Sequence, residues 1–176
     1  GFIFMTNFQD HDTARFDQTD LQLKLKLKKQ TLIIPSSKTF TLKKDQSVIL
    51  PFNLSMEGAL LKYSTTQLLA KVEEKNAVHY FFFAPEGLRT EYSFDKSTLS
   101  SGKEFYTPKP GLKSTFSITV KNGKTLKITT LTRQQALNTT KVNNHILITE
   151  ATVLPEKEQC TLLSLGKTQI SYALYT

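Results

Sequence analysis

The most regular alternation of hydrophobic and polar positions in this chain lies in residues 21–28, which have the sequence LQLKLKLK. Successive side chains of a β-strand point to opposite faces, so this period of two predicts a half-buried strand with its leucines inside and its lysines in solvent. A row of lysines would also suit an anionic ligand. A solvated strand face already accounts for the pattern, however, and it discourages edge-to-edge pairing.

Short runs rich in Val, Ile, Thr, Phe and Tyr, which favour strands, follow one another along the chain. Strands are expected over residues 1–5, 31–35, 39–42, 47–54, 59–72, 77–84, 90–94, 115–120, 124–129, 145–149, 160–165 and 169–175. Residues 96–112 are expected to form a loop. This succession predicts an all-β fold, an antiparallel β-sandwich of two packed sheets with many short strands.

Two of these runs contain residues that bear on their assignment as strands. Residues 59–72 have a leucine spacing that also fits a helix, but Tyr63-Ser-Thr-Thr66 is poor helix material, which favours a strand. Pro51 has no backbone N–H to donate to a neighbouring strand. The strand that contains it is therefore expected at a sheet edge or with a bulge.

The turn near residue 122 predicts a particular hairpin register. A three-residue loop over residues 121–123 pairs Ile118 with Leu126 and Phe116 with Ile128, which keeps the apolar side chains on one face. A two-residue Asn-Gly turn would mix the faces. The pattern therefore selects a type I turn with a glycine bulge.

One short helix is expected near residues 132–139. The Thr132 side chain can accept from the first free backbone N–H groups, and Gln135 occupies the capping-box position three residues later. A helix of about two turns is marginal by itself, so packing must hold it in place.

Composition narrows the function without defining it. The 176 residues are expected to form a single β-rich domain. Their formal charge is +8, but the basic residues are spread along the sequence, so a nucleic-acid partner is not expected. The single cysteine, Cys160, rules out an internal disulfide and a thiolate metal cluster. No apolar run has the length of a membrane-spanning helix, and no membrane partner is expected.

Few residues are candidates for catalysis or metal binding. Asp10-His-Asp12 is the one local group of metal-ligand types, but adjacent side chains of an extended chain point to opposite sides. His79 lies in an apolar strand, where a hydrogen-bonded structural role is expected. Neither a Gly-x-Ser-x-Gly motif nor a glycine-rich phosphate loop is present, and no pair of distant carboxylates indicates glycoside hydrolysis. We therefore expect no catalytic residue, cofactor or metal in this chain.

Four stretches, in order, resemble one family. They are GFIFMTNFQ at residues 1–9, VILPFNL with LKYSTTQLL within residues 48–69, YFFFAPEGLRTEYSF at residues 80–94 and LTRQQAL at residues 131–137. Each is similar to a segment that follows the catalytic barrel in bacterial β-galactosidases of glycoside hydrolase family 35. Family members usually have Asn, Tyr and Arg where this chain has Thr6, Phe8 and Asp10, which predicts altered specificity if this segment touches substrate or barrel.

The resemblance implies that residues 1–176 are an accessory domain of a longer multidomain glycosidase, placed after a (β/α)8 barrel. In that family, two Glu residues of the barrel perform retaining hydrolysis of terminal β-galactosides, so this domain alone is not expected to be an enzyme. The family also implies a periplasmic or extracellular location.

Three roles remain open for the domain. It could pack an apolar face against its own catalytic barrel, bind carbohydrate through exposed aromatic residues, or act as a stand-alone protein-interaction domain. The residues expected to contact carbohydrate or barrel are Asn7, Phe8, Tyr63, Glu91, Tyr92 and Tyr106, with Tyr172 as a further stacking candidate. The absence of Trp weakens the second role. A contiguous apolar patch that includes the first strand would favour the first.

Overall fold

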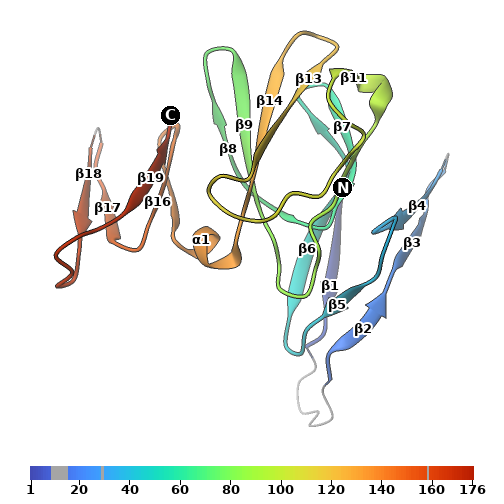
Figure 1. The fold of residues 1–176 in the computed structure, drawn as a ribbon, viewed down its shortest axis with the longest axis horizontal. Helices are drawn as coiled ribbons and strands as arrows, with labels where there is room; N and C mark the ends of the chain where they lie inside the picture. Colours follow the sequence, from blue (N-terminus) through green and yellow to red (C-terminus); the bar gives the residue numbers. More distant parts are fainter. Residues whose placement is uncertain (9–15, 29, 158) are drawn as a thin grey trace.

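The fold is built almost wholly from β-strands, as a computed structural model of residues 1–8, 16–28, 30–157 and 159–176 shows (Figure 1). Two five-stranded sheets pack face to face, and smaller two- and three-stranded sheets flank them. The predicted all-β sandwich with one short helix is confirmed. Among the described residues, no helix is long and apolar enough to span a membrane.

The first large sheet has its strands in the order β1-β6-β7-β10-β12. These are β1 (Phe2–Thr6), β6 (Ser47–Met56), β7 (Ala59–Ser64), β10 (Tyr92–Phe94) and β12 (Phe105–Tyr106). Strand β6 lies between two neighbours, not at an edge, but its first half pairs with β1 and its second half with β7. Pro51 is the last residue paired with β1, so its missing N–H falls where β6 changes partner.

The second large sheet has the order β11-β13-β14-β9-β8. These are β11 (Leu99–Ser101), β13 (Thr115–Val120), β14 (Thr125–Leu131), β9 (Ala77–Phe83) and β8 (Gln67–Glu73). Strands β9 and β14 run parallel, from Ala77 opposite Thr125 to Phe83 opposite Leu131. The other strand pairs within the described residues are antiparallel, as the sequence predicts.

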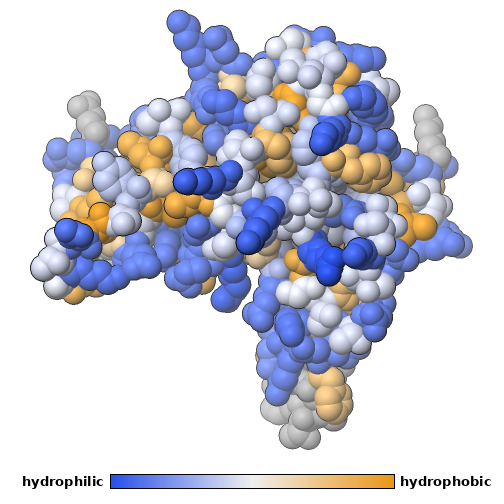
Figure 2. Space-filling view, viewed as in Figure 1, coloured by the Kyte–Doolittle hydropathy of each residue, from blue (hydrophilic) through white to orange (hydrophobic). Residues whose placement is uncertain are grey.

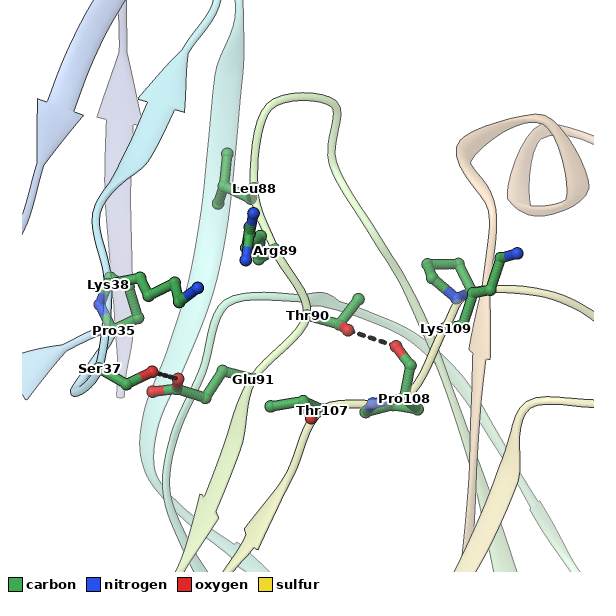
Figure 3. Close-up of a pocket in the computed structure, with 11 residues that line it drawn as sticks. Pro35, Ser37, Lys38, Leu88, Arg89, Thr90, Glu91, Thr107, Pro108 and Lys109 are labelled. Atoms are coloured by element: carbon green, nitrogen blue, oxygen red, sulfur yellow. Dashed lines mark hydrogen bonds between the residues drawn. The ribbon is translucent and has the colours of Figure 1, made fainter.

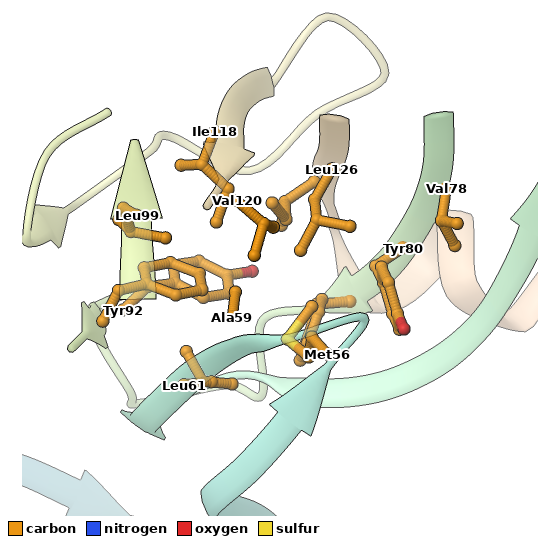
Figure 4. Close-up of a cluster of buried hydrophobic side chains, with 13 residues drawn as sticks. Met56, Ala59, Leu61, Val78, Tyr80, Tyr92, Leu99, Ile118, Val120 and Leu126 are labelled. Atoms are coloured by element: carbon orange, nitrogen blue, oxygen red, sulfur yellow. The ribbon is translucent and has the colours of Figure 1, made fainter. Parts of the chain in front are cut away.

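The main core fills the space between the two large sheets (Figure 4). Met56 and Leu61 of the first sheet meet Ile118 and Leu126 of the second, and all four side chains are no more than 1% exposed. Tyr92 is fully buried among them, with its ring edge-on to that of Phe82. Apolar side chains alternating along strands of both sheets thus account for the sandwich.

Two hairpin-like pairs cover the outer face of the first sheet. They are β2 (Gln18–Leu21) with β5 (Phe40–Leu42), and β3 (Leu23–Lys26) with β4 (Thr31–Ile34). Leu42 of β5 packs against Leu50 of β6, and Ile34 of β4 packs against Tyr63 of β7. The alternating leucines between residues 21 and 27 are half-buried on this side, and the intervening lysines are exposed.

The C-terminal strands lie against the outer face of the second sheet. They form a three-stranded sheet of β15 (Thr139–Val142), β16 (His145–Thr149) and β19 (Tyr172–Tyr175), and a pair of β17 (Thr152–Pro155) and β18 (Cys160–Leu163). Ile146 and Ile148 pack on Phe81 and Leu131. Figure 2 shows hydrophobic side chains gathered over these strands, where Tyr172 is 64% exposed.

Local turn chemistry is confirmed at both positions where the sequence specifies it. Ile118 pairs with Leu126 and Phe116 with Ile128, which is the register of a three-residue loop, and Gly123 has a φ of +87°. Helix α1 (Arg133–Leu137) begins with a complete capping box, because Thr132 Oγ1 accepts from the Gln135 N–H and Gln135 Oε1 accepts from the Thr132 N–H.

Three local predictions are wrong. Residues 59–72 are not one strand, because the chain bends at Thr65 and Thr66 between β7 of the first large sheet and β8 of the second. The alternating segment 21–28 is not one strand, because the chain changes partner at Gln22, whose side chain donates to the Pro35 carbonyl (3.0 Å). Residues 96–112 are not wholly loop, because they contain a 3₁₀ turn (Lys96–Thr98) and strands β11 and β12. Those two strands take their hydrogen-bonding partners from β13 and β10, which lie elsewhere in the sequence.

Gly87 and Gly123 provide a matched test of steric constraint. Both have positive φ, +78° and +87°, but a Cβ at Gly87 would lie 2.4 Å from the Thr41 carbonyl oxygen, whereas one at Gly123 would meet nothing within 4 Å. We expect Gly123→Ala to cost about 1–2 kcal/mol of backbone strain and Gly87→Ala to cost a further 1–3 kcal/mol or so for displacing β5. Urea unfolding followed by circular dichroism measures both, and equal losses would contradict the clash.

Candidate functional site

Glu91 is a buried carboxylate just before β10, and only 6% of it is exposed. Its Oε1 atom accepts hydrogen bonds from the Tyr63 hydroxyl (2.5 Å), the Ser36 N–H (2.8 Å) and the Ser36 hydroxyl (3.1 Å). Its Oε2 atom accepts from the Ser37 hydroxyl (2.9 Å). Both carboxylate oxygens are therefore occupied by donors from the protein itself.

The hydrogen bonds decide the charge state of this group. Burial by itself raises the pKa of Glu91, but the bonds from Tyr63, Ser36 and Ser37 outweigh that effect and hold the pKa below its usual value. Burial, together with the bond to Glu91, raises the pKa of the Tyr63 hydroxyl well above its usual value. The pair therefore consists of an ionised carboxylate and a protonated phenol.

Thr65 fixes the segment that carries Glu91. Its hydroxyl donates to the Arg89 carbonyl (2.6 Å) and accepts from the Glu91 N–H (2.7 Å), and its own N–H donates to the Glu91 carbonyl (3.0 Å). These bonds join the residue after β7 to the chain before β10. The sequence leaves open whether Glu91 points inward or outward. The hydrogen bonds of Thr65 hold this segment so that the Glu91 side chain points inward.

A cavity of about 600 Å³ opens beside Glu91 (Figure 3). It lies between the turn after β4, the segment before β10 and the loop after β12, and its walls include Pro35, Leu88 and Pro108. The hydroxyl of Thr90 donates to the Pro108 carbonyl, which ties two of these segments together. The cavity is therefore assembled from three segments that are far apart in the sequence.

Positive charge dominates the rim of this cavity. Lys38, Arg89 and Lys109 line it and are exposed, and Glu91 is the acidic residue among its described lining. Retaining hydrolysis of a glycoside needs two carboxyl groups about 5 Å apart. The described lining offers one carboxylate with both oxygens already bonded, so this arrangement suits binding of an anion and not acid–base catalysis on a sugar.

Some of the residues expected to contact carbohydrate or barrel are buried, and others lie at the surface. Tyr63 and Tyr92 are 3% and 0% exposed, so the expectation that they offer stacking faces is wrong. Tyr63 points its hydroxyl at Glu91, and Tyr92 shares a hydrogen bond with Thr130 (2.7 Å). Both rings serve packing, because each strand turns that side chain inward and its hydroxyl finds a buried partner.

The other expected contacts lie at or near the surface. Asn7 is half-buried, and its side-chain amide donates to the carbonyls of Phe16 (2.7 Å), Lys43 (3.1 Å) and Leu42 (3.3 Å), so it braces the chain after β1. Phe8 is 56% exposed. Tyr106 is half-buried and stacks on Phe116, with ring centres 3.9 Å apart. The structure does not bring Asn7, Tyr106 and Glu91 into one cavity.

Strand β1 carries an exposed apolar surface, which we call the first-strand patch and define as Phe2, Phe4 and Ile49. Their exposed fractions are 44%, 74% and 42%, and Phe4 lies directly opposite Ile49 in the pairing of β1 with β6. The alternate residues Ile3 and Met5 pack on the core. Strand β1 is thus apolar on both faces, one of which is open.

The candidate metal ligands do not assemble a site within the described residues, which contain no group of three His, Cys, Asp or Glu suited to a metal. The segment Asp10–Asp12 lies outside the described residues. His79 is structural as expected, because it is 4% exposed and its Nε2 atom shares a hydrogen bond with Thr129 (2.7 Å).

These features define a β-sandwich domain in which a buried carboxylate is bonded within the structure. Residues 4–153 match the family model described as β-galactosidase, domain 2. The chain therefore belongs to this family, whose members are accessory domains of a glycosidase and so part of a larger protein with a catalytic domain. The match includes the Glu91 site and almost all of both large sheets. No curated protein matches the chain.

The role of Glu91 can be tested by Glu91→Gln. A glutamine side chain would place an NH₂ group against donors, so we expect the free energy of unfolding at pH 7 to fall by about 2–4 kcal/mol. Because the folded-state pKa is below the unfolded value, this contribution is present above about pH 4.5 and is lost as pH falls through the folded pKa. Urea unfolding between pH 3 and 7, roughly, measures both effects.

Glu150→Gln is the matched control, because Glu150 is exposed and forms a surface ion pair with Lys167. We expect it to leave the unfolding midpoint unchanged. A loss at Glu91 that matches the loss at Glu150, or that stays constant as the pH is lowered, would contradict the structural role of the Glu91 carboxylate.

Proposed function

We propose that this domain supports the catalytic barrel of a β-galactosidase of glycoside hydrolase family 35, and that the first-strand patch is the surface that contacts the barrel. The parent enzyme would hydrolyse terminal β-galactosides of carbohydrates and act in the periplasm or outside the cell. The membership of the domain-2 family supports the connection with a catalytic domain.

The single observation that carries this proposal is the exposure of Phe2, Phe4 and Ile49 on one face of an edge strand. Burying one exposed Phe side chain is favourable by about 1.5–3 kcal/mol. An apolar edge strand left in water is also a site for unwanted pairing with other chains. Packing of this patch on a neighbouring domain of the same protein would bury the apolar side chains and prevent the unwanted pairing. The burial of Tyr63 and Tyr92 leaves less support for the alternative role, in which exposed aromatic rings stack on carbohydrate.

The substitution Phe4→Ser tests the proposal when it is made both in this chain and in the full-length protein. In this chain Phe4 is mostly exposed, so we expect Tm to shift by less than about 2 °C. In the full-length protein the same change removes buried apolar area, and we expect Tm to fall by about 3–8 °C. Differential scanning calorimetry measures both shifts.

Leu165→Ser is the control, because Leu165 is 82% exposed and lies among the C-terminal strands, beyond the matched residues. It should leave Tm unchanged in both proteins. An unchanged Tm for Phe4→Ser in the full-length protein would remove the first-strand patch from the interface. Failure of the full-length protein to hydrolyse 4-nitrophenyl β-D-galactoside would contradict the proposed activity and leave the interface result standing.

A further inference from the structure

Two neighbouring cavities share the loop that follows β12. The first is the cavity of about 600 Å³ beside Glu91, and the second, of about 350 Å³, is lined by residues of β12 and the start of β13. Thr107 and Pro108 line both. We call the two together the loop-107 groove. Their combined size suits a ligand of several linked rings and is far larger than an inorganic ion needs.

Unpaired cations surround the loop-107 groove. They are Lys38, Arg89 and Lys109 at the first cavity and Lys103 and Lys113 at the second. None of these five side chains forms an ion pair with another described residue, whereas Lys43, Lys62 and Lys127 each have a carboxylate oxygen within 2.8 Å. In Figure 3 the Lys38 side chain extends towards the segment that carries Arg89 and Glu91.

The acidic side chain that lines this groove offsets one of the five positive charges and forms no ion pair with a described cation. Glu91 is nearly buried, and both of its oxygens accept hydrogen bonds from Tyr63, Ser36 and Ser37. The groove keeps an excess of positive charge, and a concave surface with such an excess attracts anions. Arg89 can in addition bind a carboxylate or sulfate through two parallel N–H donors.

Aromatic and apolar groups give the groove flat walls. Phe105 is 46% exposed, and Tyr106 is held in place by its stacking on Phe116 and by the Lys103 N–H, which donates to its hydroxyl (2.7 Å). Pro35, Leu88 and Pro110 line the first cavity. The Ser114 hydroxyl, at the second cavity, is buried and has no hydrogen-bond partner among the described residues. It is a polar group that a ligand could satisfy.

We propose that the loop-107 groove binds an acidic saccharide whose sugar units carry carboxylate or sulfate groups. The cations bind the acidic groups, and the apolar faces of the sugar rings pack on Phe105 and the proline walls. A neutral glycan would leave the five cations without partners, and an acidic peptide would make no use of the flat walls. This binding is separate from support of the catalytic barrel and does not depend on the first-strand patch.

Isothermal titration calorimetry of this chain at low ionic strength tests the proposal. The probes are a hexamer of galacturonate, the same hexamer with its carboxylates methyl-esterified, and a sulfated carrageenan hexasaccharide. We expect saturable binding of at least one acidic probe, and binding of the neutral ester that is weaker by about tenfold or more. The two acidic probes distinguish carboxylate from sulfate. No binding of either one overturns the proposal.

Two double variants with the same net charge locate the site. Lys38→Gln with Arg89→Gln should weaken binding of the acidic probe by about tenfold or more. Lys24→Gln with Lys26→Gln removes two exposed lysines of β3 that line neither cavity, and should change affinity by less than about twofold, an effect of net charge alone. Equal losses in the two variants would show attraction to the charge of the whole chain and would overturn the assigned site.

Phe105→Ala and a non-sugar polyanion test the saccharide part. The variant should weaken binding of the acidic hexamer by about threefold to tenfold, because a ring contact is lost. A poly-aspartate peptide or a single-stranded oligonucleotide of equal charge should bind at least about tenfold more weakly than the hexamer. If either polyanion binds as tightly as the saccharide, or if Phe105→Ala has no effect, the groove is a general anion surface and the proposal fails.

Discussion

The burial of β9 on both of its faces is the constraint on which the rest of this domain depends. Its even-numbered residues, such as Tyr80 and Phe82, fill the core between the two large sheets. Its odd-numbered residues face the C-terminal strands, where Phe81 packs against Ile146 and Ile148. A strand covered on both sides has a nearly continuous apolar sequence, which accounts for the YFFFA run at residues 80–84. The strand therefore holds three layers together.

Polar groups buried in this arrangement are matched to partners on neighbouring strands. His79 of β9 reaches Thr129 of the parallel strand β14, and burial lowers the pKa of its imidazole, which favours the neutral ring. Tyr92 and Thr130 form a similar buried pair. Glu91 joins the turn after β4 to β7 and β10 in the same way. Burying these polar groups costs little free energy because each donor finds an acceptor. The pairs also fix which strands are neighbours.

The surface offers two contrasting regions, and each suits a different partner. The first-strand patch is apolar and exposed, which suits packing on another domain of the same protein. The loop-107 groove is concave and cationic, which suits a charged ligand in solution. The two regions use different residues, so an accessory domain can support a catalytic domain and still keep a binding site of its own.

The sequence by itself determined the features that depend on neighbouring residues. The hairpin register around Gly123, the capping box of Thr132 and Gln135, and the existence of most strands follow from turn chemistry and from alternation with a period of two. Period two says that alternate side chains share a face, but not which face is covered. Only the tertiary structure therefore decided that Glu91 and Tyr92 point inward and that β9 runs parallel to β14. It also brought Lys38, Arg89 and Lys109 to one cavity, because contacts between distant segments leave no local pattern in the sequence.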